Sequence, residues 1–234
     1  MNTSIRWAAA TGIVLISMLA ASCATLNRLD RYDFEGAALA ASMATPPAPR
    51  LDIRYDVTLD RRQPVLSAFS VVTNLSKASQ AEKATNAMRD ALASVDVPGM
   101  ILEESFAACA EAFGARPVDR RSEADFLLDL EIVQWGIEAD SPGSAVALHL
   151  QLDARLYHAS DREMVWRRSV SVSKPASPSM FGLGPILGDM VTAEALSNMN
   201  EHDLAEGFLE LARETARAVV NKLERDFRSA RYDG

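Results

Sequence analysis

The chain has 234 residues, of which 48% are hydrophobic, and it carries a formal net charge of −8 at neutral pH. This length and apolar content predict one ordinary folded domain with a real core. The acidic balance argues against nucleic-acid binding and against broad adhesion to anionic lipid, because both depend on clustered Lys and Arg.

Residues 1–22 have the layout of a secretory signal peptide. Arg6 is their only charged side chain, and an apolar run follows it from Gly12 to Leu19. This run is shorter than the roughly 20 apolar residues that a membrane-spanning helix needs, and small residues follow it. The segment therefore predicts export. Two alternatives remain open: an uncleaved anchor helix, and ordinary cleavage near Ser22 that releases a periplasmic protein.

The run Leu19-Ala20-Ala21-Ser22-Cys23 resembles the lipobox of bacterial lipoproteins. In such proteins the signal is cut before the cysteine, here between Ser22 and Cys23. The thiol receives diacylglycerol and the new amino group is acylated, and these covalent chains are the only cofactors expected. Ala20 stands where leucine is commonest. Ala24 resembles the residue that follows the cysteine in lipoproteins sorted to the outer membrane, which implies its inner leaflet, facing the periplasm.

Residues 23–50 are predicted to form a lipidated tether that lifts the periplasmic domain, residues 51–234, from the membrane. The tether ends in Ala44-Thr45-Pro46-Pro47-Ala48-Pro49, and such proline clusters favour extended, semi-rigid backbone. The alternative is that Arg31-Tyr32-Asp33-Phe34 forms a short strand or a contact point on the domain.

The first half of the domain predicts two strands and two helices. Apolar and polar residues alternate over 51–60, which is typical of a half-buried strand, and 65–73 is apolar on both faces, as in a central strand. A capping box begins a helix over 79–94. A second helix spans about 100–113 and ends at Gly114.

The second half of the domain predicts an antiparallel meander. Alternation over 126–137, 146–157 and 164–172 places one face of each strand on the core and the other in water. A closing helix over 201–228 has an apolar stripe at helical spacing. The predicted fold class is therefore α+β: a mixed, largely antiparallel sheet of about five strands, backed by two to three helices that include the long C-terminal one.

Residues 174–200 are predicted to be a long loop, because glycine and proline recur in them and prevent a continuous helix. The middle of the loop is apolar, and adaptable apolar surfaces contact partner proteins, acyl chains or membranes. The candidate contact residues are Met180, Phe181, Leu183, Ile186, Leu187 and Met190. The alternative is a loop folded over the core, whose deletion would cost thermal stability.

Two segments resemble a broad group of envelope lipoproteins. Glu123-Ala124-Asp125-Phe126-Leu127-Leu128 is similar to a segment that opens a strand in that group, and Arg162-Glu163-Met164-Val165-Trp166 to its hairpin with an apolar pair ending in Trp. The group includes auxiliary lipoproteins of ABC-type lipid transporters, curli secretion channel lipoproteins and the N-terminal domain of the Tol translocation protein. Here the hairpin has no glycine, and a Tyr-rich segment after the anchor is not evident. The resemblance covers about residues 65–227 and implies a non-enzymatic adaptor.

The sequence predicts no catalytic residue and no metal ligand. His149, His158 and His202 lie in no metal-ligand spacing, and no Gly-x-Ser-x-Gly elbow marks a nucleophilic serine. Cys109 falls on the apolar stripe of its helix, where a free cysteine is commonly a core residue. If Cys23 carries lipid, Cys109 has no disulfide partner within the chain.

Charged and aromatic residues of the meander are expected to play structural roles. Asp129 and Glu131 share one face of a strand, where they are expected to meet water and arginines opposite, Arg155 and Arg167. The tryptophans of the meander, Trp135 and Trp166, are expected to pack against the core or the sheet edge.

Together these patterns predict an outer-membrane lipoprotein that is not an enzyme. Its expected role is an adaptor or accessory component of an envelope assembly, such as a lipid or solute transport system. The expected partners are the membrane, through the lipid anchor, and a protein of the cell envelope. Two alternatives remain: a carrier that holds a lipid between sheet and helices, and an envelope hydrolase built from ordinary Ser, Asp and Arg residues.

Overall fold

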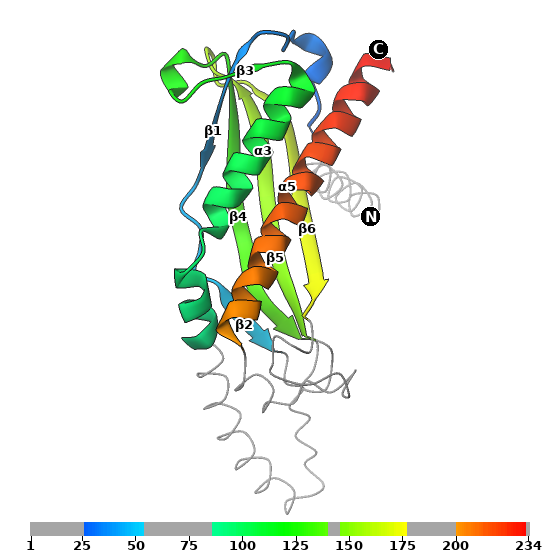
Figure 1. Cartoon of the computed structure of the whole chain (residues 1–234). Coiled ribbons are helices and arrows are strands. Elements are labelled where there is room, and N and C mark those ends of the chain that lie inside the picture. The colour runs from blue at the N-terminus through cyan, green and yellow to red at the C-terminus, as the bar shows by residue number, and fades with distance from the viewer. Residues whose placement is uncertain (1–25, 54–85, 140–145, 177–199, 233–234) are drawn as a thin grey trace, which may run out of the picture.

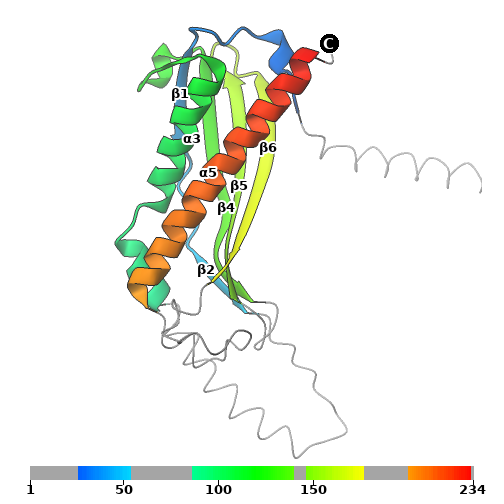
Figure 2. The same ribbon diagram turned by 45° about the vertical axis from the view of Figure 1, so that its right-hand side comes forward.

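A mixed β-sheet with helices on one face makes up the part of the chain that the computed structural model describes, residues 26–53, 86–139, 146–176 and 200–232 (Figure 1). The sheet has six strands in the order β3-β1-β4-β5-β6, with β2 also beside β4. Helices α3 and α5 lie side by side across the sheet, and Figure 2 shows that both cover the same face. The predicted α+β class with a long C-terminal helix is confirmed.

The centre of the sheet is the predicted antiparallel meander. It consists of β4 (Phe126–Ala139), β5 (Val146–His158) and β6 (Met164–Pro175). Every second side chain points to the helices, so the strands bury one face and leave the other polar. The core residues of these strands include Leu128, Leu130, Leu148, Leu150, Leu152 and Val170, each at most 1% exposed.

A β-bulge in β4 keeps its apolar residues on the core side. The register with β5 shifts between Ile132 and Gln134, which turns Val133 outward, where it is 45% exposed. After this extra residue the buried positions move to Trp135 and Ile137. Trp135 therefore packs in the core, as predicted, and its indole N–H donates to the Pro47 carbonyl at 2.7 Å.

Two short strands share the outer edge of β4. Strand β1 (Ala38–Met43) pairs in parallel with the first part of β4, and β2 (Arg50–Ile53) pairs in parallel with its last part. Strand β3 (Arg116–Pro117) adds a further parallel rung outside β1. The sheet is thus five strands wide with six segments, because one position holds β1 and β2 in succession.

The predicted tether over residues 23–50 is wrong from Leu26 onward. Strand β1 lies inside this range and its residues Ala38, Leu39 and Ala40 are buried. The prolines of 44–49 end β1 and carry the chain to β2, because proline cannot continue the hydrogen-bonded ladder. The small residues of β1 have the composition of a linker, so the sequence pattern concealed a strand.

The helix layer follows the predictions with small shifts at the ends. Helix α3 (Val97–Phe113) begins three residues before the predicted Met100, because the Asp96 carboxylate accepts from the Gly99 N–H at 2.9 Å and Pro98 fits the first turn. It ends at Gly114, which has a left-handed φ of 65°, as predicted.

Helix α5 (Glu201–Tyr232) runs beyond the predicted Arg228. Its buried stripe includes the residues that the sequence placed there, Leu204, Phe208, Leu211, Thr215, Val219 and Leu223. Residues 86–93 form part of the predicted helix over 79–94, with Met88 and Ala91 buried; the earlier part lies outside the described residues. The predicted strand over 65–73 and all but the start of the one over 51–60 also lie outside them.

The two ends of the sheet differ in what they hold. One end, called the hairpin end here, gathers residues 26–37, the β5–β6 hairpin at 159–163 and the last turns of α5 (Figure 1). Strands β4 and β6 start at the hairpin end and finish at the opposite end, where β5 and α5 start. The described ranges end at residues 53, 139 and 176 and resume at residues 86, 146 and 200. All of these residues lie at the end opposite the hairpin end.

Candidate functional site

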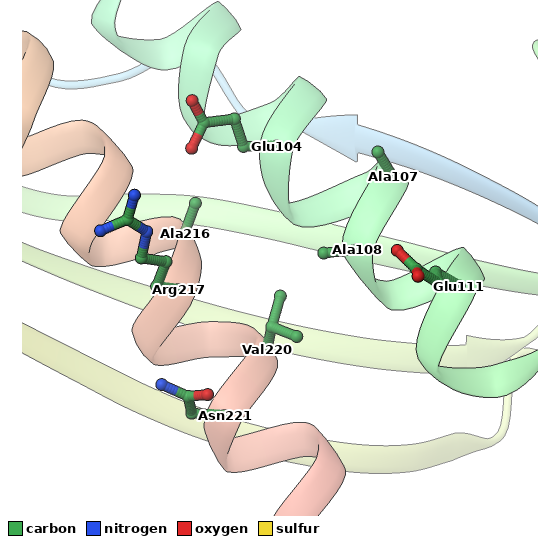
Figure 3. A pocket seen from close by; sticks show the side chains of 8 residues that line it. All are labelled: Glu104, Ala107, Ala108, Glu111, Ala216, Arg217, Val220 and Asn221. Atoms are coloured by element: carbon green, nitrogen blue, oxygen red, sulfur yellow. The ribbon is translucent and has the colours of Figure 1, made fainter.

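A solvent-open groove of about 470 Å³ runs between α3 and α5 on the outer face of the helix layer (Figure 3). Small or apolar side chains line its floor, and polar ones stand along it from both helices. On each helix the lining residues recur at helical spacing, so they form one facing stripe. The groove is lined by Glu104, Ala107, Ala108, Glu111, Ala216, Arg217, Val220 and Asn221.

The chemistry of this groove suits a protein segment. Alanines leave space for the backbone of an incoming helix or strand to approach closely, and Val220 adds apolar area. Glu104 and Glu111 on α3 face Arg217 and Asn221 on α5, so the rim offers both acceptors and donors. An amphipathic helix laid into a groove uses these features: an apolar strip with polar flanks.

A second hollow, of about 400 Å³, lies on the open face of the sheet near the hairpin end. Asp129 is held at its edge by the Ser42 hydroxyl, which donates at 2.9 Å, and by Arg121 at 3.8 Å. The hollow is lined by Arg121, Leu127, Asp129, Tyr157, His158, Ala159 and Arg162. Arg121 and Asp129 form an ion pair with each other and Arg162 adds a further positive charge, which makes the hollow a polar surface of mixed sign.

Asp153 is the centre of a charged cluster on the same sheet face. Its carboxylate accepts from the Ser169 hydroxyl at 2.5 Å, from Arg167 at 2.8 Å and from Arg155 at 3.2 Å. Burial alone would raise the pKa of Asp153. The hydrogen bonds lower that pKa by more than burial raises it, so it lies below its usual range. The predicted pairing across the strands is confirmed for Arg155 with Glu131, at 2.7 Å, whereas Arg167 is paired with Asp153.

Asp153→Asn should lower the free energy of unfolding by about 1–3 kcal/mol at neutral pH, because hydrogen bonds to a charged acceptor are lost. Since the folded pKa is below the unfolded one, the carboxylate stabilises the fold above about pH 4, and its contribution is lost as pH falls through the folded pKa. Urea unfolding across pH should therefore show the difference between the proteins shrinking in acid. The control Asp119→Asn, at an exposed position, should show no such trend; a pH-independent difference for Asp153 would contradict the assignment.

Cys109 is a core residue, as predicted, at 1% exposure. Burial raises the pKa of its thiol to about 12, so the reactive thiolate is scarce at physiological pH. This environment is the reverse of the one that activates a nucleophilic cysteine.

Native protein should leave Cys109 unmodified by a thiol reagent such as iodoacetamide at pH 8, whereas protein unfolded in guanidinium should react fully. The reason is that both thiolate formation and access require the core to open. Peptide mapping by mass spectrometry reads the modification at this residue alone. Rapid labelling of the native protein would contradict the structure.

Each histidine lies beside a single carboxylate. His149 is 3.7 Å from Glu138, His158 is 3.1 Å from Asp161, and His202 is 3.5 Å from Glu206. Within the described ranges no three His, Cys, Asp or Glu side chains gather as metal ligands would.

The predicted site residues fall outside the described part of the chain. This is true of Ser22 and Cys23 at the lipobox and of the apolar contact residues between Met180 and Met190. The first residue that the structure describes is Leu26, three residues after Cys23.

The chain from Leu26 onward is bound to the edge of β6. The Arg167 N–H donates to the Leu26 carbonyl at 3.1 Å, and the Arg28 N–H donates to the Val165 carbonyl at 2.9 Å. These bonds form one antiparallel rung beside the first residues of β6. Residues 26–34, called the docked N-terminal segment from here on, thus contact the sheet through this single bridge at Asn27 and continue as a 3-10 helix over Leu29–Arg31.

Side chains fix the docked N-terminal segment to α5 and to the hairpin. The Asn27 amide donates to the Asp226 carbonyl at 2.9 Å, and Leu29 is fully buried. Arg28 forms an ion pair with Glu163, whose carboxylate also accepts from the Tyr32 hydroxyl at 3.0 Å. The segment is therefore part of the folded body.

Phe34 ends the docked segment inside the core. Its ring stacks on Phe113 at 4.4 Å between centroids and lies 4.5 Å from Phe126, and the residue is 1% exposed. The alternative prediction of a contact point at Arg31-Tyr32-Asp33-Phe34 is confirmed. The signal in the sequence was two aromatic residues among charged ones.

No pattern in the sequence predicts the polar cluster beneath this segment. The Asp226 carboxylate is buried; it accepts from the Trp166 indole N–H at 2.8 Å and forms an ion pair with Arg168, whose Nε lies 2.7 Å away. Trp166 itself is fully buried, as its predicted packing role requires. Asp226 thereby joins α5 to β6 at the point where Asn27 also binds.

No protein-family model matches the sequence, and no curated protein matches it. Solved structures do resemble the fold. A protein from Xanthomonas campestris aligns with 82% of this chain and 89% of its own, at 16% identity and a TM-score of 0.34. A lipoprotein from Neisseria meningitidis aligns with 31% of this chain and 68% of its own, at 13% identity and a TM-score of 0.26.

PelC from Paraburkholderia phytofirmans, a dodecamer, aligns with 79% of this chain and 89% of its own, at 9% identity and a TM-score of 0.27. The likeness to these proteins is one of fold and goes no further. The resemblance to transporter auxiliaries, curli channel lipoproteins and the Tol domain stays a prediction.

Proposed function

We propose that this chain is an outer-membrane-anchored periplasmic lipoprotein that acts as a non-enzymatic adaptor in an envelope assembly, such as a lipid or solute transport system. The observation that carries the adaptor role is the open groove between α3 and α5, whose alanine floor and charged rim suit a protein segment. The lipobox at Cys23 supports the proposed anchoring at the membrane. No helix among the described residues is both long and apolar enough to span a bilayer.

Two features favour an adaptor over the alternatives. The space between sheet and helices, where a carrier would hold a lipid, is filled by side chains such as Leu128, Leu150 and Phe208, all fully buried in one cluster. A hydrolase would need a strongly shifted group in a cleft, whereas the large shift described above belongs to the buried thiol of Cys109.

The apolar residues from Met180 to Met190 are a second proposed contact for the partner. In the sequence they lie between Pro175, the last residue of β6, and Glu201, the first residue of α5. Removing them should leave the melting temperature almost unchanged and weaken partner capture. A large loss of thermal stability would instead assign them to the core.

The test is a cross-linked pull-down of the full-length, membrane-extracted protein, with bound proteins and lipids identified by mass spectrometry. Ala108→Arg places a long cation on the floor of the groove and should reduce recovery of the partner about tenfold, which corresponds to about 1.4 kcal/mol. Glu103→Arg, at an exposed position on the same helix but outside the groove lining, is the matched control. Stoichiometric lipid without a protein partner would overturn the adaptor role in favour of a carrier.

A further inference from the structure

We propose that the basic end of α5, formed by Arg225, Arg228 and Arg231, faces the phospholipid headgroups, and that α5 is inclined so that its acidic start points away from the membrane. This orientation rests on the proposed acylation of Cys23. It assigns a membrane-facing surface to a domain that includes the predicted tether from Leu26 onward.

The first argument is the length of chain outside the described part. Cys23 lies three residues before Leu26, and three extended residues span at most about 11 Å. Leu26 is fixed by hydrogen bonds to β6, and Asn27 is fixed to the carbonyl of Asp226 on α5. An acylated Cys23 therefore keeps the last turns of α5 close to the lipid surface.

The second argument is the charge along α5. The part from Glu201 to Glu214 carries five acidic side chains and one basic one, whereas the part from Arg217 to Arg231 carries five basic and two acidic ones. Asp226 in the second part is buried and paired with Arg168, so Glu224, which lies 3.6 Å from Arg228, is the one acidic side chain of this part that offsets its exposed basic charge. Basic residues near an anionic leaflet are attracted by about 1 kcal/mol each, and acidic ones are repelled.

The two arguments point to the same end of the helix. With 32 residues at a rise of 1.5 Å, α5 is about 48 Å long, so an inclined helix carries its acidic start well clear of the headgroups. Stabilisation of the helix dipole would explain acidic residues in the first turn and basic residues in the last turn only. In α5 the acidic residues extend over the whole first half and the basic residues over the whole second half. Beside the docked segment Asp30 and Arg31 are both exposed, so their opposite charges offset each other, and a charged surface there opposes insertion into the hydrocarbon.

The orientation can be measured on full-length, acylated protein in vesicles of phosphatidylethanolamine and phosphatidylglycerol. A fluorophore is attached to Arg228→Cys or to His202→Cys, both exposed and about 40 Å apart along α5. Nitroxide groups on the lipid headgroups act as quenchers, and buried Cys109 remains unlabelled in the native protein. Quenching should be several-fold stronger at position 228 than at 202, and Arg225→Glu with Arg231→Glu should reduce that ratio.

A second variant tests whether the short connection between Cys23 and Leu26 holds this end of α5 at the membrane. About 20 Gly and Ser residues inserted between Thr25 and Leu26 give a flexible linker with an r.m.s. length of roughly 25 Å, and quenching at position 228 should fall. Equal quenching at both positions in the parent protein, or stronger quenching at 202, would overturn the orientation. Flotation with the vesicles and the mass of the N-terminal peptide are read from the same sample. Protein that neither floats nor carries acyl chains overturns the lipid anchor itself, a separate failure.

Discussion

Asp226→Ala should lower the free energy of unfolding by about 3–5 kcal/mol, because it leaves a buried charge and a buried indole N–H without their acceptor. The carboxylate accepts from Trp166 at 2.8 Å and forms an ion pair with Arg168 at 2.7 Å, and the Arg168 side chain is only 14% exposed. For a domain of this size the loss corresponds to a fall in melting temperature of roughly 10 °C, which circular dichroism can follow.

Two further variants identify the cause of this loss. Glu224→Ala removes a half-exposed carboxylate two residues before Asp226 in α5, which pairs with Arg228 at 3.6 Å, and should change stability by less than about 0.5 kcal/mol. Combining Asp226→Leu with Arg168→Leu removes both charges and should recover part of the loss, since an apolar pair can replace a buried ion pair. A change of under about 1 kcal/mol for Asp226→Ala would show that the cluster does not hold α5 to β6.

Gly136→Ala should lower the free energy of unfolding by roughly 2–5 kcal/mol and release β2 from β4. Gly136 pairs with Arg50 and has a φ of 141°, which residues with side chains rarely adopt. A Cβ atom there would lie 1.9 Å from the Arg50 carbonyl oxygen, so backbone must move. Hydrogen exchange of the amides in Arg50–Ile53 should accelerate more than that of amides in β5.

Gly36→Ala is the matched control, because the same methyl group is added at a positive φ of 73° but meets no atom within 4 Å. It should cost only the backbone strain, about 1–2 kcal/mol, and leave the exchange of β2 unchanged. If both substitutions cost the same, the close approach of β2 to Gly136 is not a stabilising contact.

The elements that the sequence predicted well are those with long periodic patterns. Strands β4, β5 and β6 alternate over a dozen residues each, and α5 repeats its apolar stripe over its whole length. Periodicity of this length is insensitive to one irregular residue, which is why the bulge at Val133 did not hide β4. Asp96 was missed as the cap of α3 because the Pro98-Gly99 pair after it resembles the end of a helix.

Contacts between distant parts of the chain could not be predicted in this way. Strand β1 is short and rich in alanine, and its burial follows from pairing with β4, about 87 residues later. The roles of Asn27 and Asp226 likewise exist only after β6 and α5 are in place. The groove between α3 and α5 needs the relative placement of two helices, although its residues show helical spacing on each.

The docking of Asn27 beside Asp226 also sets an order of folding. The two residues are 199 positions apart, so the first described segment of the chain finds its binding place only when the last helix has formed. Pairings of such high sequence separation close late and slow the overall rate, because the loop entropy is lost before the contact is gained. The central meander and its neighbouring helix turns can form early, whereas the N-terminal residues stay unpaired and exposed in the meantime. A chain truncated before α5 should therefore lack the closing step, and refolding of the complete chain should end with the burial of Leu29 and Phe34.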